Sequence, residues 1–574
     1  MTNSETESYK DEDLVGRILS GASTNEAPFQ LLELAEQGKV FEGKLILIIR
    51  SFDKQKLLGR VNEIQPYQEF YQKGGIFSAA IRKAQKVPSE IANRYISGKM
   101  QLLMELPRNE INFPPQPGDP IYLIDPKKNV KDIFGIDEKE PGIAWFGSLI
   151  GYSGLKVPFN VNNLTMHIAI LGTTGSGKSF DTGALYESLT KIKVDETRMI
   201  SVPTMIIDAN GDYLEYYEYF CKKKQINSCS WLKRYVFPNI YKYIPNDEKN
   251  ENLGQIKIDL NILNSRDLAE TIILYKLGHL EEADLQISLL TRFFTNLESR
   301  SPRPDINQLF TEESIIRELN DFLNEENEKQ SWAAATVKAA ISALGTFKEV
   351  ESNYNLLSNK QASDLTSKNM IAEITKNGGT AIIDFSIKGA ANVMPKVKQL
   401  VVAYLATFLY EIFSRYAVES LGDLRYARRY LFFIIEEAQN FIPDISYPIP
   451  NSLAKSKLAL IATQGRKFGL CLGLVTQRPS FVDRIVLSMC NSFFIHRLSP
   501  EDISYTQKAS GGLPPEMVSK LTRLPKGEAF FLGQTNFVNF PLHIKITHED
   551  RKIPHEMGST NLVKDLKQLR YPGV

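Results

Sequence analysis

The stretch that decides the fold is residues 167–180, which read His167-Ile-Ala-Ile-Leu-Gly-Thr-Thr-Gly-Ser-Gly-Lys-Ser-Phe180. It begins with a short apolar run, Ile168 to Leu171, which predicts a buried parallel strand. The next residues fit the pattern G-x-x-x-x-G-K-[ST] at every fixed position, and a helix-compatible segment follows from Phe180 to Leu189. A strand, a glycine-rich turn and a helix in this order predict a phosphate-binding loop.

The residue types in this loop suit the binding of a nucleotide phosphate. Glycines let successive backbone N–H groups point at phosphate oxygens, and the N-terminus of the following helix favours the same anion. Lys178 can reach the β- and γ-phosphates, and the Ser179 hydroxyl can ligate Mg²⁺. A glycine-rich turn without a ligand is the alternative, and the flanking strand and helix argue against it. The expected nucleotide contacts are Gly172, Thr174, Gly175, Ser176, Gly177, Lys178, Ser179 and Phe180.

A pair of acids after a later apolar run predicts the second half of an ATPase site. Residues 430–440 read Tyr430-Leu-Phe-Phe-Ile-Ile-Glu-Glu-Ala-Gln-Asn440. Glu436 would hold Mg²⁺ through water, and Glu437 would orient or deprotonate the attacking water. An exposed acidic turn after a core strand is the alternative, but it becomes the weaker explanation once the phosphate loop is considered with it.

Two further polar side chains follow predicted strands. Asp208 ends the apolar run Val202 to Ile207. A carboxylate just past the C-terminal end of a strand lies where ligands bind in open α/β sheets. Gln477 follows the run Leu470 to Val475 closely, and from that position it could sense the γ-phosphate.

A basic turn precedes that last strand. Arg466 and Lys467 stand just before Gly469, and two cations there are suited to reach the phosphates bound by a neighbouring copy. A solvated basic turn explains the charges equally well.

Composition places limits on the class of protein. The net charge of the 574 residues is +1, so a nucleic-acid contact would need a local basic surface or a site built by several subunits. The four cysteines form no C-x-x-C pair and the histidines show no zinc spacing, which indicates reduced core thiols. The first 13 residues are polar and acidic, and the apolar segment Val397 to Phe413 is too short and too polar for a confident membrane span. We therefore expect a cytoplasmic protein.

The chain pattern predicts an α/β protein with several parts. Short apolar runs with frequent turn residues predict a β-barrel or sandwich, interrupted by a helical excursion around 67–97. Segments 14–19 and 29–35 are expected to be short helices. The expected parts are a partly disordered N-terminal arm at 1–39, a β-barrel at 40–155, an ATPase core at 156–213 and 376–545, a mainly helical insertion at 214–375, and a C-terminal strap at 546–574, which could reach a neighbouring subunit.

Several motifs in this order resemble the HerA-type hexameric ATPases, relatives of the FtsK translocases in the additional-strand P-loop class. The resemblance covers roughly residues 40 to 545 and implies a RecA-like core preceded by a small barrel of the HAS type. The stretches that carry it are H-I-A-I-L-G-T-T-G-S-G-K-S, I-I-D-A-N-G-D-Y, A-I-I-D-F-S, F-F-I-I-E-E-A-Q-N-F-I-P, G-R-K-F-G-L, V-T-Q-R-P-S and L-P-K-G-E-A-F-F-L-G.

The resemblance also implies roles for single residues. Glu437 matches the catalytic carboxylate, Gln477 matches the sensor, and Arg466 matches an arginine that acts in trans on the adjacent subunit's nucleotide. Lys178 and Ser179 match the phosphate and Mg²⁺ ligands. Asp208 matches an acidic position near the nucleotide. The chain departs from the family at three positions: Gln439 and Asn210 stand where the family often has histidine, and Asp212 stands where it often has glutamate.

The implied function is an ATP-driven double-stranded DNA translocase or helicase that works as a hexameric ring with ATP and Mg²⁺. Such a motor is expected to be coupled to a partner effector in anti-phage defence or DNA end processing. The alternative is a motor or scaffold subunit whose main output is to assemble and activate a partner, either a nuclease of the NurA type or a sirtuin-type NAD-degrading enzyme. A metabolic kinase is a third hypothesis, which the tandem acids and the barrel disfavour.

Overall fold

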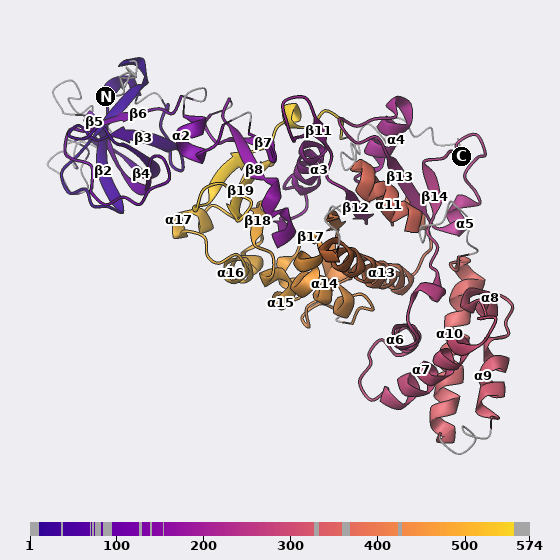
Figure 1. Ribbon diagram of the computed structural model, residues 1–574. Coiled ribbons are helices and arrows are strands. Elements are labelled where there is room, and N and C mark those ends of the chain that lie inside the picture. The colour runs from indigo at the N-terminus through magenta and orange to yellow at the C-terminus, as the bar shows by residue number, and fades with distance from the viewer. Residues whose placement is uncertain are drawn as a thin grey trace, which may run out of the picture.

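The computed structural model describes residues 11–555, with gaps at 36–37, 69–70, 72–73, 75–77, 79–81, 84–93, 126–128, 138–139, 153, 326–331, 359–367, 423–427 and 450. Figure 1 shows three regions in a row, with a barrel at one end, a large sheet flanked by helices in the middle, and a lobe of helices at the other end.

A closed barrel forms the N-terminal region. Its strand order is β1-β2-β5-β4-β3-β6. Phe29, Ile46, Leu57, Met100 and Ile121 are completely buried inside it. The strands are β1 (Leu14–Ile18), β2 (Glu26–Leu31), β3 (Leu45–Ile49), β4 (Lys56–Gln68), β5 (Arg94–Glu105) and β6 (Pro120–Tyr122).

The boundaries of this barrel differ from those that the sequence predicts. Segments 14–19 and 29–35, expected as helices of an arm, contribute β1 and part of β2, so the barrel begins well before residue 40. The reason is visible in β2, where buried and exposed side chains alternate with the period of a strand. The expected helical excursion at 67–97 is strand at both ends, and most of the rest lies outside the described residues.

A sheet of twelve strands forms the middle of the molecule, in the order β14-β13-β15-β12-β16-β17-β9-β18-β19-β20-β7-β8. The strands from β14 to β18 run parallel, and the remaining four are antiparallel to their neighbours. The parallel ones are β9 (Ile168–Leu171), β12 (Thr204–Asp208), β13 (Leu232–Val236), β14 (Leu253–Gln255), β15 (Thr380–Asp384), β16 (Leu431–Ile435), β17 (Leu470–Thr476) and β18 (Ser492–Ile495). The others are β7 (Ile143–Leu149), β8 (Lys156–Asn160), β19 (Glu528–Gly533) and β20 (Leu542–Lys545).

This strand order confirms the predicted fold class. Strand β17 lies between β9, which leads into the phosphate loop, and β16, which ends at the paired acids. An additional strand between these two is what the expected class of P-loop ATPase requires. Strand β7 belongs to this sheet, although the sequence placed it in the barrel, and β8 lies within the predicted core.

Helices cover both faces of the sheet and form the separate lobe. The main flanking helices are α3 (Lys178–Leu189), α4 (Leu214–Lys223), α11 (Lys368–Asn377), α13 (Pro395–Gly422), α14 (Lys455–Phe468) and α16 (Pro500–Ala509). The lobe contains α6 (Ser265–Leu277), α7 (Asp284–Ser299), α8 (Ile306–Thr311), α9 (Ile315–Leu323) and α10 (Ala334–Tyr354). The short elements are α2 (Val130–Phe134), α5 (Pro238–Tyr241), α12 (Ile387–Ala390), α15 (Arg484–Ser488), α17 (Pro515–Val518) and the hairpin of β10 (Ile192–Lys193) and β11 (Met199–Ile200).

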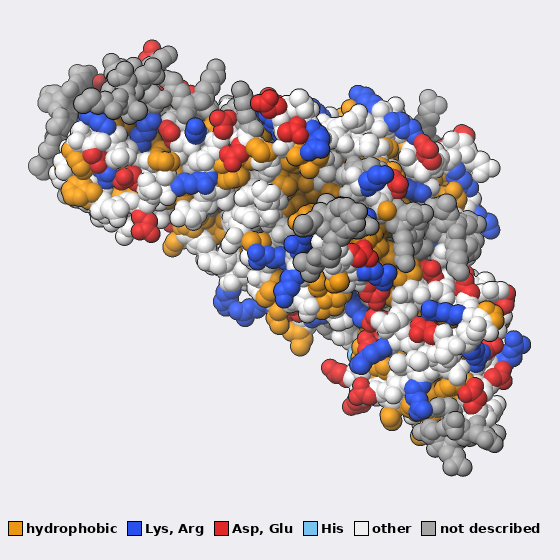
Figure 2. Space-filling model, viewed as in Figure 1, with side chains coloured by type: hydrophobic (Ala, Val, Ile, Leu, Met, Phe, Trp, Pro, Cys, Tyr) orange, Lys and Arg blue, Asp and Glu red, His pale blue; other side chains and the backbone are white. Residues whose placement is uncertain are grey.

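The lobe corresponds to the predicted helical insertion but is narrower than 214–375. Strands β13 and β14 fall within that range and belong to the sheet. Strand β13 was not predicted because the charged residues Lys233 and Arg234 are unusual in a core strand. In the structure, the Arg234 guanidinium pairs with the buried carboxylate of Asp384 at 2.5 Å. On the face shown in Figure 2, cationic and anionic side chains are interspersed over this lobe, as expected for solvated helices.

Helix α13 is long and apolar, and the segment Pro395–Ser420 could cross a membrane by length and composition alone. However, 78% of its most apolar window is buried inside the protein, where the helix packs against α14. The core therefore accounts for its hydropathy. All four cysteines are free.

Candidate nucleotide site

The phosphate loop joins β9 to α3, and its glycines have backbone conformations that other residues rarely adopt. The φ angle is 76° at Gly175 and 103° at Gly177. A Cβ atom at Gly177 would lie 2.8 Å from the backbone nitrogen of Gly527, whereas a Cβ at Gly175 would meet nothing within 4 Å. The loop is thus closed on the Gly527 side and open at Gly175, where a phosphate would approach.

Glu436 directly follows β16 and is buried. Only 1% of its surface is exposed, and neither carboxylate oxygen has a hydrogen bond within the described part of the chain. Burial raises the pKa of Glu436 well above its usual range, and the nearby Lys178 ammonium acts in the opposite direction. A buried carboxylate with two unused oxygens fits a hydrated divalent cation, with the Ser179 hydroxyl as the second protein ligand.

Glu437 is held by side-chain amides from three other positions. Its backbone is in the left-handed region, with φ of 49°. Gln477 Nε2 donates to Oε1, Gln439 Nε2 donates to Oε2 at 2.5 Å, and Asn210 Nδ2 approaches Oε1 at 3.4 Å. These donors fix the carboxylate in one orientation, as a group that positions an attacking water requires.

Gln477 also connects the catalytic acid to the phosphate loop. Its Oε1 accepts a hydrogen bond from the Thr174 hydroxyl, while its Nε2 donates to Glu437. The structure therefore brings together the predicted loop, the predicted catalytic acid and the predicted sensor Gln477.

Asp208, predicted as a nucleotide contact, accepts hydrogen bonds from the backbone of the loop after β12. Its Oδ1 accepts from the backbone N–H groups of Gly211 at 2.7 Å and Asp212 at 3.0 Å, and its Oδ2 accepts from Tyr213 N–H at 3.0 Å. Burial and the neighbouring Asp384 raise the pKa of Asp208 to about 7. Both oxygens are engaged in shaping the loop after β12, so Asp208 is a structural residue within this chain.

Arg466 is the predicted site residue that the structure does not bring to the loop. It lies in the last turn of α14, before β17 begins, and it is exposed. Strand β17 runs parallel to β9, so Arg466 is at the opposite edge of the sheet from Lys178. The seven residues of β17 alone span about 20 Å. Arg466 therefore cannot contact a nucleotide bound by its own chain without a large rearrangement.

Sequence reasoning missed a buried pair beneath the loop. His496 Nδ1 lies 3.4 Å from Asp181 Oδ2, and both side chains are almost fully buried. Burial, with the Lys178 charge, lowers the pKa of His496 to about 3. A Cβ at Gly172 would lie 2.7 Å from His496 Cβ, so this pair supports the start of the loop. Asp181 could have been noticed two residues after Ser179, but the position of His496 depends on the pairing of β18 with β9.

Comparisons with known proteins agree with this geometry. The family profile described as "Helicase HerA, central domain" matches residues 144–409. The DNA double-strand break repair helicase HerA of Sulfurisphaera tokodaii is 24% identical over 97% of both chains. The probable helicase MJ1565 of Methanocaldococcus jannaschii is 25% identical over 82% of this chain and 79% of that protein.

Among solved structures, the bacterial conjugative coupling protein TrwB aligns with a TM-score of 0.45 and 15% identity, over 74% of this chain and 93% of that one. This likeness is too distant to inform function. The chain is thus similar to HerA helicases along most of its length, and its phosphate loop with the paired acids is that of an ATP-hydrolysing P-loop enzyme.

Proposed function

We propose that the protein is an ATP-driven motor that translocates along or separates double-stranded DNA, and that it works as a ring of six copies. The relatives named as DNA double-strand break repair helicases support the choice of substrate. The observation that carries the ring is the exposed Arg466 at the sheet edge opposite Lys178. In a ring, the Arg466 edge of one copy can face the loop edge of the next.

The chemistry follows from the residues around the loop. Lys178 and the loop amides bind the β- and γ-phosphates, and Glu437 orients the attacking water. Mg²⁺, held by Ser179 and through water by Glu436, would neutralise charge that develops on the phosphates. Loss of the γ-phosphate frees Gln477 to bond Thr174 and Glu437 as it does here, which offers a route from nucleotide state to loop position.

A ring also fits the near-neutral charge of the chain. Six copies of a modest basic loop can surround a duplex, and contacts to phosphate need no sequence reading. We propose that this motor is cytoplasmic and works with a separate effector, a nuclease or an NAD-degrading enzyme, in DNA end processing or anti-phage defence. This part rests on the sequence resemblance.

ATP hydrolysis stimulated by double-stranded DNA tests the proposal. Lys178→Ala and Glu437→Gln are each expected to reduce the rate at least about 100-fold, because phosphate binding and water orientation are lost. Glu312→Gln, an exposed acid on the lobe, serves as the control and should keep the wild-type rate. A wild-type rate of ATP hydrolysis that does not change when double-stranded DNA is added, or full activity of Glu437→Gln, would reject the proposed DNA motor.

A further inference from the structure

The segment 546–555, here called the strap, leaves the sheet directly beside the phosphate loop. Strand β20 runs in the same direction as β9, so its C-terminal end lies at the loop edge. The Ile546 N–H donates to Gly527 O at 2.8 Å, and the Gly527 N–H donates to Ser176 O at 3.0 Å. Gly527 alone thus separates the start of the strap from the loop.

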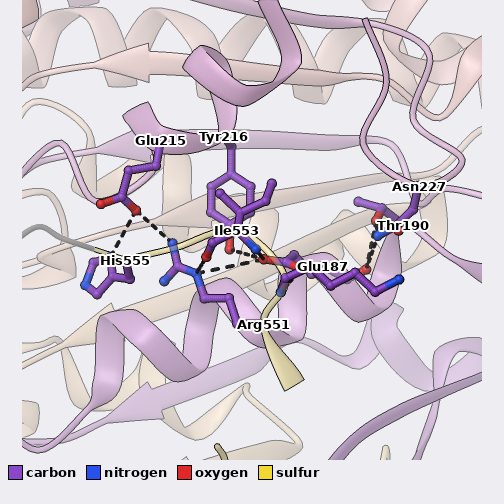
Figure 3. Close-up of polar contacts among 9 residues, drawn as sticks. Glu187, Thr190, Glu215, Tyr216, Asn227, Arg551, Ile553 and His555 are labelled. Carbon is purple, nitrogen blue, oxygen red and sulfur yellow. Dashed lines mark hydrogen bonds and ion pairs between the residues drawn. The ribbon is translucent and has the colours of Figure 1, made fainter. Parts of the chain in front are cut away.

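The strap then follows the helix that the loop begins, in the same chain. Figure 3 shows Arg551 between two acids, Glu215 on α4 and Glu187 on α3. Arg551 Nη2 donates to Glu215 Oε2 at 3.1 Å, and Glu187 accepts the backbone N–H groups of Lys552 at 2.8 Å and Ile553 at 3.2 Å. Since the side chains of Arg551 and Glu187 are each only 1% exposed, these bonds are shielded from water.

Gly183, in the middle of α3, allows Arg551 of the strap to pack closely against this helix. A Cβ at Gly183 would lie 2.7 Å from Arg551 Nη1 and 2.7 Å from the Tyr216 hydroxyl. Glycine inside a helix costs about 1 kcal/mol relative to alanine, so its presence here is explained by the approach of these two side chains. The strap is a fixed part of the α3 surface.

Phe180 faces the strap at the end nearest the phosphates. Its ring lies 5.2 Å from the His548 imidazole in an edge orientation and 6.2 Å from that of His555. The Arg551 guanidinium lies 5.4 Å from the same ring. Phe180 directly follows Ser179 and is half-buried, while His548 is exposed. The Phe180 ring and the imidazoles of His548 and His555 therefore lie close together, next to the last residue of the phosphate loop.

The direction in which a bound nucleotide extends can be inferred from the residues that lie on either side of β9. Gln477 and Glu437, which mark the γ-phosphate, lie beyond the neighbouring strands β17 and β16. The strap lies on the other flank, reached through β18, β19 and β20. A nucleotide whose γ-phosphate points at Glu437 must extend its base away from those strands, toward the strap.

We propose that Phe180, His548 and His555 form the subsite for the base and ribose of the nucleotide, held in place by Arg551. Aromatic rings bind bases by stacking on their faces. The inference rests on the proposed nucleotide function of the loop and extends it to the strap. Nucleotide binding would in this way connect α3 to the C-terminal end of the described chain.

Calorimetric titration of the full chain with ADP and, separately, with tripolyphosphate tests the inference, because only ADP has a base. His548→Ala should weaken ADP binding about tenfold, which corresponds to about 1.4 kcal/mol, and leave tripolyphosphate binding unchanged. Phe180→Ala should act in the same way, and Phe180→Trp should retain ADP binding. His279→Ala, an exposed histidine of the lobe, is the matched control.

The outcomes separate this inference from the function of the loop. Lys178→Ala should lose both ligands, and a wild-type chain that binds neither would contradict the loop itself. If the wild type binds both, unchanged ADP affinity in His548→Ala and Phe180→Ala overturns the base subsite. Equal weakening of both ligands in these variants overturns it too, because it would show a general structural effect.

Discussion

His167, just before β9, shows how one residue ties the phosphate strand to its neighbours. The Leu472 N–H donates to Nδ1 at 2.9 Å, so Nε2 carries the proton and donates to Ala462 O at 3.0 Å. Both partners belong to the α14–β17 unit, which also carries Arg466 and leads to Gln477. The neutral imidazole thus helps to hold the strand that leads into the loop against the strand that carries the sensor.

The state of His167 predicts a pH dependence of stability. Burial, followed by the Arg466 charge, lowers the pKa of His167 to about 4, below its ordinary 6.5. Between these values the unfolded chain binds a proton that the folded chain does not, so stability falls as pH falls through this window. The full loss is up to about 3 kcal/mol.

Unfolding measured from pH 7.5 to 4 in the wild type and in His167→Asn gives the test. Asparagine removes the titrating group, and because only the pH slopes are compared, a constant effect of the strained backbone at this position, with φ of 60° and ψ of 150°, cancels. The variant should show the shallower pH dependence. Equal slopes would mean that His167 does not titrate as described.

Single residues of the site were predictable where their chemistry is written in consecutive positions. Lys178, Ser179 and Glu437 follow from motifs, because phosphate binding and catalysis require fixed residue types at fixed spacing. The amide donors around Glu437 come from separate loops, so their convergence depends on the fold. The bonds that Asp208 accepts from the backbone were not predictable, because the same carboxylate position suits a nucleotide contact or a backbone cap.

At the scale of elements, strand β2 tests the revised barrel boundary. Phe29 is fully buried, and a Cβ on Gly98 of β5 would lie 2.7 Å from Phe29 Cζ. Phe29→Ala should reduce the stability of the barrel by about 3–5 kcal/mol. Gln30→Ala, an exposed neighbour on the same strand, should change it by less than about 0.5 kcal/mol.

Hydrogen exchange of the β5 amides reports this difference locally. Faster exchange in Phe29→Ala than in Gln30→Ala confirms that β2 belongs to the core. Similar exchange in the two variants would instead agree with a separate arm. The sequence could not decide this, because β2 is short and contains Pro28, and its partner β5 is far along the chain.

At the scale of the whole molecule, the parallel order of the sheet was predictable and the extent of the parts was not. Continuously apolar strands such as β9, β12, β16 and β17 are recognisable because both their faces are buried. Charged strands such as β13 are less recognisable, because they are stabilised by partners elsewhere in the chain. The parallel direction of the neighbouring strands β9 and β17 places Arg466 and Lys178 at opposite edges of the sheet, and the proposed site shared between two copies rests on this separation.

The measurement that tests the proposed sharing of one ATPase site between two copies most directly is ATP hydrolysis by mixtures of Arg466→Ala and Glu437→Gln chains. Each variant alone should be nearly inactive, because each site takes Glu437 from one copy and Arg466 from the next. In a random equal mixture, about a quarter of the sites combine both intact residues, so about a quarter of the wild-type rate should return. No recovery on mixing, or a wild-type rate from Arg466→Ala alone, would contradict a site shared between copies.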